Sequence, residues 1–137
     1  MMFSNLFEPG QIGKMKVKNR IVFSAIDSAS ADLNGCVTPL TIHHYVERAK
    51  GGVGLIIVEI NYTEPRGKWN LHQLSMANDG SLAGHRDLVY AIHTYGTKVA
   101  CQLHHTGRII HCDTGYELVA PSGQYPSVNP QFPEGRP

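Results

Sequence analysis

The 137-residue chain has few cysteines, no excess of either charge and no long hydrophobic run. Its three cysteines, Cys36, Cys101 and Cys112, are sparse and odd in number, which argues against a disulfide framework and indicates a reducing compartment. The formal charge of +1 argues against nucleic acid and against an anionic membrane surface as partners. No apolar run approaches the ~20 residues that cross a bilayer, and residues 1–20 contain no secretory core. We therefore expect a cytoplasmic protein.

Three apolar runs rich in β-branched residues predict buried strands at residues 21–26, 53–60 and 98–103. Because Cys101 lies within the third run, we expect its thiol to be buried and inert. Apolar residues at helical spacing predict helices over residues 40–50 and 82–95.

The ends of both helices carry recognisable signals. The first helix is expected to begin after an N-cap at Thr38 and to end at the Gly51-Gly52 pair. Ser81 is expected to cap the second helix, with Leu82 as part of its apolar stripe.

The predicted elements alternate as strand, helix, strand, helix, strand, and then a proline-rich loop. Apolar strands joined by helices predict a parallel sheet with right-handed connections. Residues 15–17 add a short hairpin near the amino terminus, and residues 61–80 are expected to form a long loop. The pattern alone fits either a doubly wound open sheet or part of a (β/α)₈ barrel.

Three sequence runs carry a resemblance: residues 18–24 (KNRIVFS), 48–59 (RAKGGVGLIIVE) and 102–108 (QLHHTGR). In this order and spacing they resemble the N-terminal part of the old yellow enzyme family, the FMN-dependent ene-reductases. The resemblance implies an α/β fold that is the N-terminal portion of a (β/α)₈ TIM barrel, with an N-terminal hairpin, three parallel strands, two helices and a long loop after the third strand. Since a closed barrel takes ~250 residues, we expect residues 1–137 to be a partial barrel domain, truncated before the third helix.

Active sites of such barrels lie at the carboxyl ends of the strands. Residues 24–27, 59–61 and 102–108 should therefore converge on one rim. Gln102 is the strongest candidate, because its amide offers both an acceptor and a donor, as the pyrimidine edge of a flavin requires. The resemblance implies that Gln102 binds this edge and stabilises negative charge on the reduced ring. The alternative is a glutamine that only caps a loop.

The segment Ser24, Ala25, Ile26 and Asp27 matches the family segment that contacts the flavin after the first strand. Ala25 and Ile26 depart from the proline and the methionine or leucine that are usual there. Asp27 replaces a thiol, a threonine or another small polar residue, and its carboxylate would lower the reduction potential of the flavin. Alternatively, Asp27 faces water.

Ile60 occupies a position that is usually alanine or glycine, where the backbone approaches the flavin. Its β-branched side chain is expected to narrow that approach. The resemblance therefore implies six flavin contacts, at Ser24, Ala25, Ile26, Asp27, Ile60 and Gln102.

Two other motifs predict no chemistry. The glycines of residues 51–54 follow a helix and open a strand, which is the reverse of a dinucleotide-binding fingerprint. No structural zinc site is expected, because the candidate ligands lack the spacing of such a site. They are His104, His105, His111 and Cys112, together with Cys101. His105 is expected to pack or to anchor its loop.

The resemblance implies FMN as cofactor, NADH or NADPH as reductant and a small activated alkene as substrate. The family's substrate-binding pair, proton-donating tyrosine and flavin-phosphate loops follow the third helix and have no counterpart here. We therefore expect no catalytic residue in this chain, weak FMN binding and no turnover. The alternative is a non-catalytic half-barrel that associates with itself or with a complementary fragment through its uncovered edge.

Overall fold

The computed structural model describes residues 3–109 together with residues 115, 119 and 121. The elements follow one another as α1 (Ser4–Phe7), β1 (Gly10–Ile12), β2 (Met15–Val17), β3 (Val22–Phe23), α2 (Pro39–Lys50), β4 (Leu55–Tyr62), η1 (Pro65–Gly67), β5 (Leu74–Ser75), η2 (Asp79–Ser81), α3 (Leu82–His93) and β6 (Lys98–His104). The loop predicted after the third strand lies mostly outside these residues.

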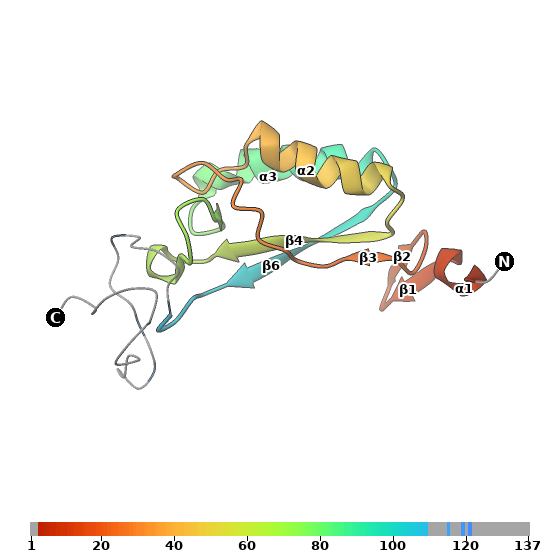
Figure 1. The fold of residues 1–137 in the computed structure, drawn as a ribbon, viewed down its shortest axis with the longest axis horizontal. Helices are drawn as coiled ribbons and strands as arrows, with labels where there is room; N and C mark the ends of the chain where they lie inside the picture. The colour runs from red at the N-terminus through yellow and green to blue at the C-terminus, as the bar shows by residue number, and fades with distance from the viewer. Residues whose placement is uncertain (1–2, 110–114, 116–118, 120, 122–137) are drawn as a thin grey trace.

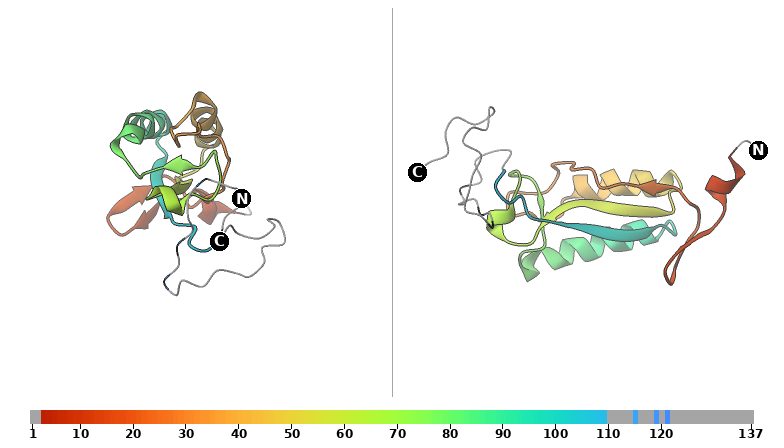
Figure 2. Two further views of the ribbon diagram at one scale, coloured as in Figure 1. Left: turned by 90° about the vertical axis from the view of Figure 1, so that its left-hand side faces the viewer. Right: turned by 90° about the horizontal axis from the view of Figure 1, so that it is seen from below.

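Strands β3, β4 and β6 form a parallel sheet, as predicted, with β4 in the centre. Helices α2 and α3 lie side by side on the same face of this sheet (Figures 1 and 2). A doubly wound sheet would carry helices on both faces, whereas a barrel keeps them all on the outside. The one-sided arrangement therefore favours the barrel.

The core lies between this sheet and the two helices. Its fully buried centre is formed by Ile56 of β4, Tyr45 of α2, and Leu88 and Ile92 of α3. Burial of a side chain of this size contributes about 1.5–3 kcal/mol. This interface fixes the helices against the sheet and thereby fixes where each strand ends.

Helix α2 begins as its sequence predicts. The Thr38 side chain accepts a hydrogen bond from the Thr41 amide, and the Thr41 side chain accepts one from the Thr38 amide, which forms a capping box. Gly52, at φ 93°, carries the chain out of the helix in the left-handed region, where glycine is the least strained residue. The glycine run is thus a turn, and a Cβ at Gly54 would collide with the backbone carbonyl of Asn19.

Two predictions for helix α3 are wrong. Ser81 has helical dihedral angles and its side chain caps no amide, because η2 precedes α3 and Asn78 caps that turn instead. Leu82 is exposed, and the buried face of the helix consists of His85, Leu88 and Ile92. A polar residue, His85, thus occupies a place that the apolar pattern gave to leucine.

The strands also differ from their predicted extents. Strand β3 is limited to two residues, because the chain after Phe23 leaves the ladder. The predicted loop of residues 61–80 contains the short strand β5, which pairs in parallel with the end of β4. Cys101 is exposed rather than buried, because β6 is the outer strand of the sheet among the described residues.

The predicted hairpin is present as β1 and β2, which pair in antiparallel fashion. It lies at the end of the molecule where β4 and β6 begin, as Figure 1 shows. A hollow of about 590 Å³ lies there between the hairpin and the start of β3. This hollow is at the end opposite to the carboxyl ends of the strands, so it is not the predicted site. Among the described helices, none is long and apolar enough to cross a membrane.

Candidate functional site

The predicted site residues lie toward the carboxyl ends of three parallel strands. Ser24 directly follows β3, Ile60 lies near the end of β4, and Gln102 lies opposite Ile60 in β6. Strands β4 and β6 both point toward the same end of the molecule (Figure 1). The fold therefore brings the three segments to one rim, as the strand order predicted.

A β-bulge in β4 sets the pairing at this rim. Val58 lies opposite Cys101 and Ile60 lies opposite Gln102, so Glu59 is an extra residue without a partner in β6. Bulges re-aim the side chains that follow them, because one additional residue reverses the alternation of faces. Here the bulge places Ile60 beside Gln102 and leaves Glu59 completely buried.

The Gln102 side chain is exposed, and its amide makes no hydrogen bond with the described residues. Most of the loop after β6 lies outside the described residues. Ile60, next to it, is half-buried. The donor and the acceptor of Gln102 are thus available to a ligand above the open face of the sheet, as a flavin pyrimidine edge requires.

The segment after β3 is mostly open to solvent: Ser24, Ile26 and Asp27 are exposed and Ala25 is half-buried. Asp27 is held from two sides. Its Oδ2 accepts a hydrogen bond from Nδ2 of Asn70 at 2.5 Å, and its Oδ1 accepts one from the Ala29 amide at 3.1 Å. The exposed carboxylate therefore has a defined orientation at the rim.

Glu59 was predicted only as part of a rim segment, and its role was missed. Oε2 of Glu59 accepts hydrogen bonds from the Ser28 amide at 2.8 Å and from the Tyr45 hydroxyl at 3.0 Å. Burial raises the pKa of the Glu59 carboxyl above its ordinary value, and burial together with Glu59 raises the pKa of Tyr45. A charged residue type in the middle of an apolar strand was the sequence signal for this network.

The loop between β4 and α3 closes one side of the rim. Gln73, which is fully buried, accepts a hydrogen bond from the Trp69 amide at 2.5 Å and lies 3.2 Å from Nδ1 of His104 through its Nε2. Burial lowers the pKa of His104, and the neighbouring His105 lowers it further. His104, with its lowered pKa, thus lies at the end of β6, next to the loop that carries Trp69.

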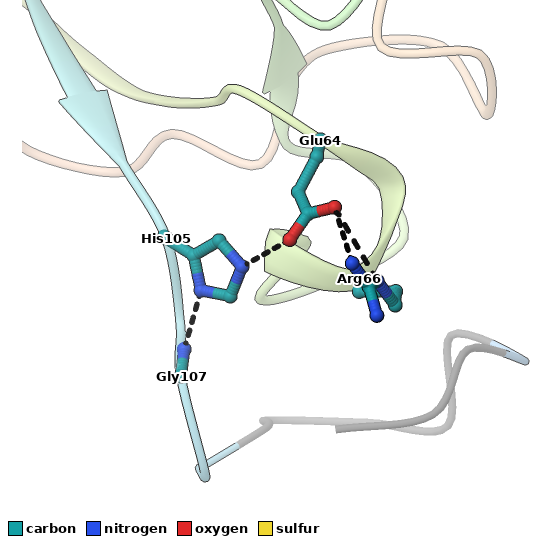
Figure 3. Close-up of polar contacts among 4 residues, drawn as sticks. All are labelled: Glu64, Arg66, His105 and Gly107. Carbon is teal, nitrogen blue, oxygen red and sulfur yellow. Dashed lines mark hydrogen bonds and ion pairs between the residues drawn. The ribbon is translucent and has the colours of Figure 1, made fainter. Parts of the chain in front are cut away.

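His105 anchors the chain after β6, as predicted. Its Nε2 lies 2.8 Å from Oε1 of Glu64, and its Nδ1 accepts a hydrogen bond from the Gly107 amide at 2.9 Å (Figure 3). Arg66 binds the other oxygen of the same carboxylate at 3.1 Å. The hydrogen bonds from His105 and then from Arg66 hold the pKa of Glu64 below its ordinary value.

No three His, Cys, Asp or Glu side chains in the described part of the chain gather as a metal site would require. Two residues of the weak metal motif, His111 and Cys112, lie outside the described residues.

Comparisons with known proteins agree with this geometry. The sequence profile described as the NADH:flavin oxidoreductase / NADH oxidase family matches residues 5–134. An NADH oxidase of Thermoanaerobacter brockii is 42% identical over 123 residues, covering 88% of this chain and 19% of the relative. An NADPH dehydrogenase of Halalkalibacterium halodurans is 38% identical over 122 residues, covering 88% of this chain and 36% of the relative.

Solved structures give the same result for the fold. An old yellow enzyme homologue from Zymomonas mobilis superimposes with a TM-score of 0.80 at 27% identity, covering 88% of this chain and 34% of that one. A 2-naphthoyl-CoA reductase superimposes with a TM-score of 0.78 at 34% identity, covering 82% of this chain and 17% of that one.

This chain thus spans about a fifth to a third of the length of these proteins. The sheet with helices on one face is therefore part of a (β/α)₈ barrel. Since the profile covers nearly the whole chain, the chain belongs to the NADH:flavin oxidoreductase / NADH oxidase family.

Proposed function

We propose that residues 1–137 form the N-terminal, flavin-facing part of an FMN-dependent NAD(P)H oxidoreductase of the ene-reductase type, ending before the third helix of the barrel. The observation that carries this proposal is the exposed Gln102 amide, unpaired among the described residues, beside Ile60 on the rim of a family barrel. The protein is expected to act in the cytoplasm.

Each of the rim residues makes a different contact with FMN. Gln102 offers its amide donor and acceptor to the pyrimidine edge, and the segment from Ser24 to Asp27 flanks the ring. Ile60 limits how closely the ring approaches β4. When bound, FMN would supply hydride transfer between NADH or NADPH and a small activated alkene. The relatives include both an NADH oxidase and an NADPH dehydrogenase, so we propose NADH or NADPH as the reductant.

The test is to complete the barrel. The chain is co-expressed with the part of the Halalkalibacterium halodurans NADPH dehydrogenase that follows the matched region, and the complex is purified. We expect bound FMN and oxidation of NADPH or NADH in the presence of an α,β-unsaturated carbonyl compound, whereas the chain alone binds FMN weakly and has no turnover. A folded complex that retains no FMN, while the intact relative retains it, would contradict the proposal.

A second candidate function follows from the surface of the outer strands. Val22 of β3 and Leu103 of β6 are 47% and 65% exposed, and β6 has no neighbour on its outer side among the described residues. Apolar, unpaired edge strands favour association. The chain could therefore act as a non-catalytic half-barrel that associates with itself or with a complementary fragment. Sedimentation of the purified chain decides this, because a stable monomer at micromolar concentration contradicts it.

A further inference from the structure

The bulge at Glu59 interrupts the ladder between β4 and β6, so its backbone groups must find partners elsewhere. The amide of Glu59 donates to the Tyr45 hydroxyl at 2.8 Å, and its carbonyl accepts a hydrogen bond from Nδ2 of Asn61 at 2.6 Å. The same Tyr45 hydroxyl donates to Oε2 of Glu59. One tyrosine of α2 thus satisfies both the backbone and the side chain of the bulged residue.

The carbonyl side of the bulge is held from α3. Asn61 accepts through Oδ1 from Nε2 of His85 at 2.7 Å, and Nδ1 of His85 lies 2.9 Å from the carbonyl of Ser81. All of these groups are buried. The bulge is therefore clamped between the two helices.

The hydrogen bonds of the bulge also include the segment after β3. Oε2 of Glu59 accepts the Ser28 amide at 2.8 Å, which ties the end of the Ser24–Ser28 segment to the bulge. Within that segment, Asp27 holds the Ala29 amide, and Ala29 has a φ of 48°, which is strained for a residue with a Cβ. A strained turn of this kind persists only where surrounding contacts determine it.

We propose that Tyr45 and Glu59 are positioning residues of this barrel: they hold the bulge and the Ser24–Ser28 segment in register, so that Asp27, Ile60 and Gln102 face one site. Neither side chain reaches the open face, because both are completely buried on the helix side of β4. The flavin part of this inference rests on the proposed function. The positioning part does not, since it concerns contacts that are present in the chain itself.

The surroundings of the pair favour the protonated form of Glu59. Its Oε1 is buried and has no hydrogen-bond partner among the described residues. A buried charged oxygen without a partner costs free energy, so this position disfavours the ionised carboxylate, while Oε2 serves as the acceptor. The groups that face the carboxyl agree with this, because burial and the charge of Asp27 raise the pKa of Glu59, while the hydrogen bonds from Ser28 and Tyr45 lower it by less.

The first experiment uses the chain as it is, without flavin. Amide hydrogen exchange is measured by NMR at Glu59, Ile60 and Ser28 in wild type, in Tyr45→Phe and in the control Tyr62→Phe. Tyr62 is also a buried tyrosine of this region, but its hydroxyl donates to Asn34 at 3.3 Å and does not touch the bulge. We expect exchange at Glu59 and Ser28 to rise ~10-fold in Tyr45→Phe and to remain within about twofold of wild type in Tyr62→Phe.

The second experiment separates charge from shape at Glu59. Glu59→Gln keeps an oxygen acceptor for Ser28 and Tyr45 and mimics the neutral acid, whereas Glu59→Leu keeps similar bulk without an acceptor. We expect Ser28 protection to be unchanged in Glu59→Gln and reduced at least ~10-fold in Glu59→Leu. If Glu59→Leu does not fold, the exchange data from Glu59→Gln and Tyr45→Phe still test the positioning role. Loss of Ser28 protection in Glu59→Gln, or equal effects of the two tyrosine variants, overturns the inference.

The consequence for the site is measured in the completed barrel. FMN affinity and the flavin reduction potential are expected to be retained in Glu59→Gln and Tyr62→Phe, and Tyr45→Phe is expected to weaken FMN binding ~10-fold. Unchanged FMN binding in Tyr45→Phe, despite faster Ser28 exchange, overturns the link to the site. A completed barrel that binds no FMN in wild type overturns the proposed function, while the exchange data decide the positioning role independently.

Discussion

Strands β4 and β6 lie side by side over seven paired positions and are both apolar in sequence, yet β4 is buried and β6 is exposed. Strand β4 has β6 on one side, β3 and β5 on the other, and the helices above it. Strand β6 has a neighbour on one side only among the described residues. The difference shows that an apolar run predicts a strand, whereas its burial depends on which neighbours the chain supplies.

The polar residues of the two strands differ in the same way. Glu59 of β4 is locked into hydrogen bonds with α2 and with the segment after β3. Gln102 of β6 is exposed, and its amide has no hydrogen-bond partner in the part of the chain that the structure describes. We infer that β4 contributes the frame of the site and β6 contributes the group that meets a ligand.

The largest difference is expected from truncating an apolar side chain in each strand. Ile56→Ala removes a completely buried side chain of β4 and should lower the free energy of unfolding by about 2–5 kcal/mol. Leu103→Ala removes a side chain of β6 that is 65% exposed and should change it by no more than about 0.5 kcal/mol. Urea denaturation monitored by circular dichroism measures both. Equal losses would mean that β6 is buried in solution, as self-association would cause.

A smaller effect, and on binding alone, is expected at Gln102. Gln102→Leu keeps similar bulk but removes the donor and the acceptor, which should weaken FMN binding in the completed barrel by about 1–3 kcal/mol, or roughly 5- to 150-fold. The reduced flavin should lose more than the oxidised one, so the reduction potential should fall. Flavin titration and a spectroscopic redox measurement test both effects.

The matching control is the stability of the chain. Because Gln102 is exposed and unpaired among the described residues, its replacement should leave the free energy of unfolding within about 0.5 kcal/mol of the wild-type value. Unchanged FMN affinity together with an unchanged potential would show that Gln102 is only a strand-end residue.

The sequence predicted the frame of this molecule better than its details. The order of strands and helices, the capping box at Thr38 and the turn at Gly52 are local features, and the structure confirms them. The burial of Cys101 was predicted wrongly, because it depends on a strand beyond β6 that the described residues do not contain. The bulge was not predicted, since the residue that hydrogen-bonds its backbone and side chain, Tyr45, is 14 positions away from Glu59. Glu59 itself, within an apolar run, was the visible sign that the regular strand would be interrupted.

A third prediction concerns pH and the buried carboxyl of β4. The pKa of Glu59 is raised above the ordinary 4.5, so the folded state favours the protonated form. Its contribution to stability is fully present below pH 4.5 and is lost as the pH rises through the raised pKa. Glu59→Gln removes this loss, so the stability of the variant relative to wild type should rise as the pH increases through the raised pKa. Denaturation curves at a series of pH values give the difference, and a difference that does not change with pH would contradict a raised pKa of Glu59.

The smallest effect is expected where the two strands end, at the contact between Glu64, which follows β4, and His105, which follows β6. The pKa of Glu64 is lowered by its hydrogen bonds, so this contact is complete above the ordinary pKa and is lost as the pH falls through the lowered value. Glu64→Gln should speed exchange of the Gly107 amide, because His105 loses the partner that orients its ring toward that amide. Arg66→Gln is the control, since it removes the other ion pair of Glu64 but leaves His105 in place. If both variants speed exchange equally, the carboxylate acts through general charge and not by anchoring His105. If only Glu64→Gln does so, the end of β6 is fixed by a residue that the end of β4 supplies, and the exposed strand takes its geometry from the buried one.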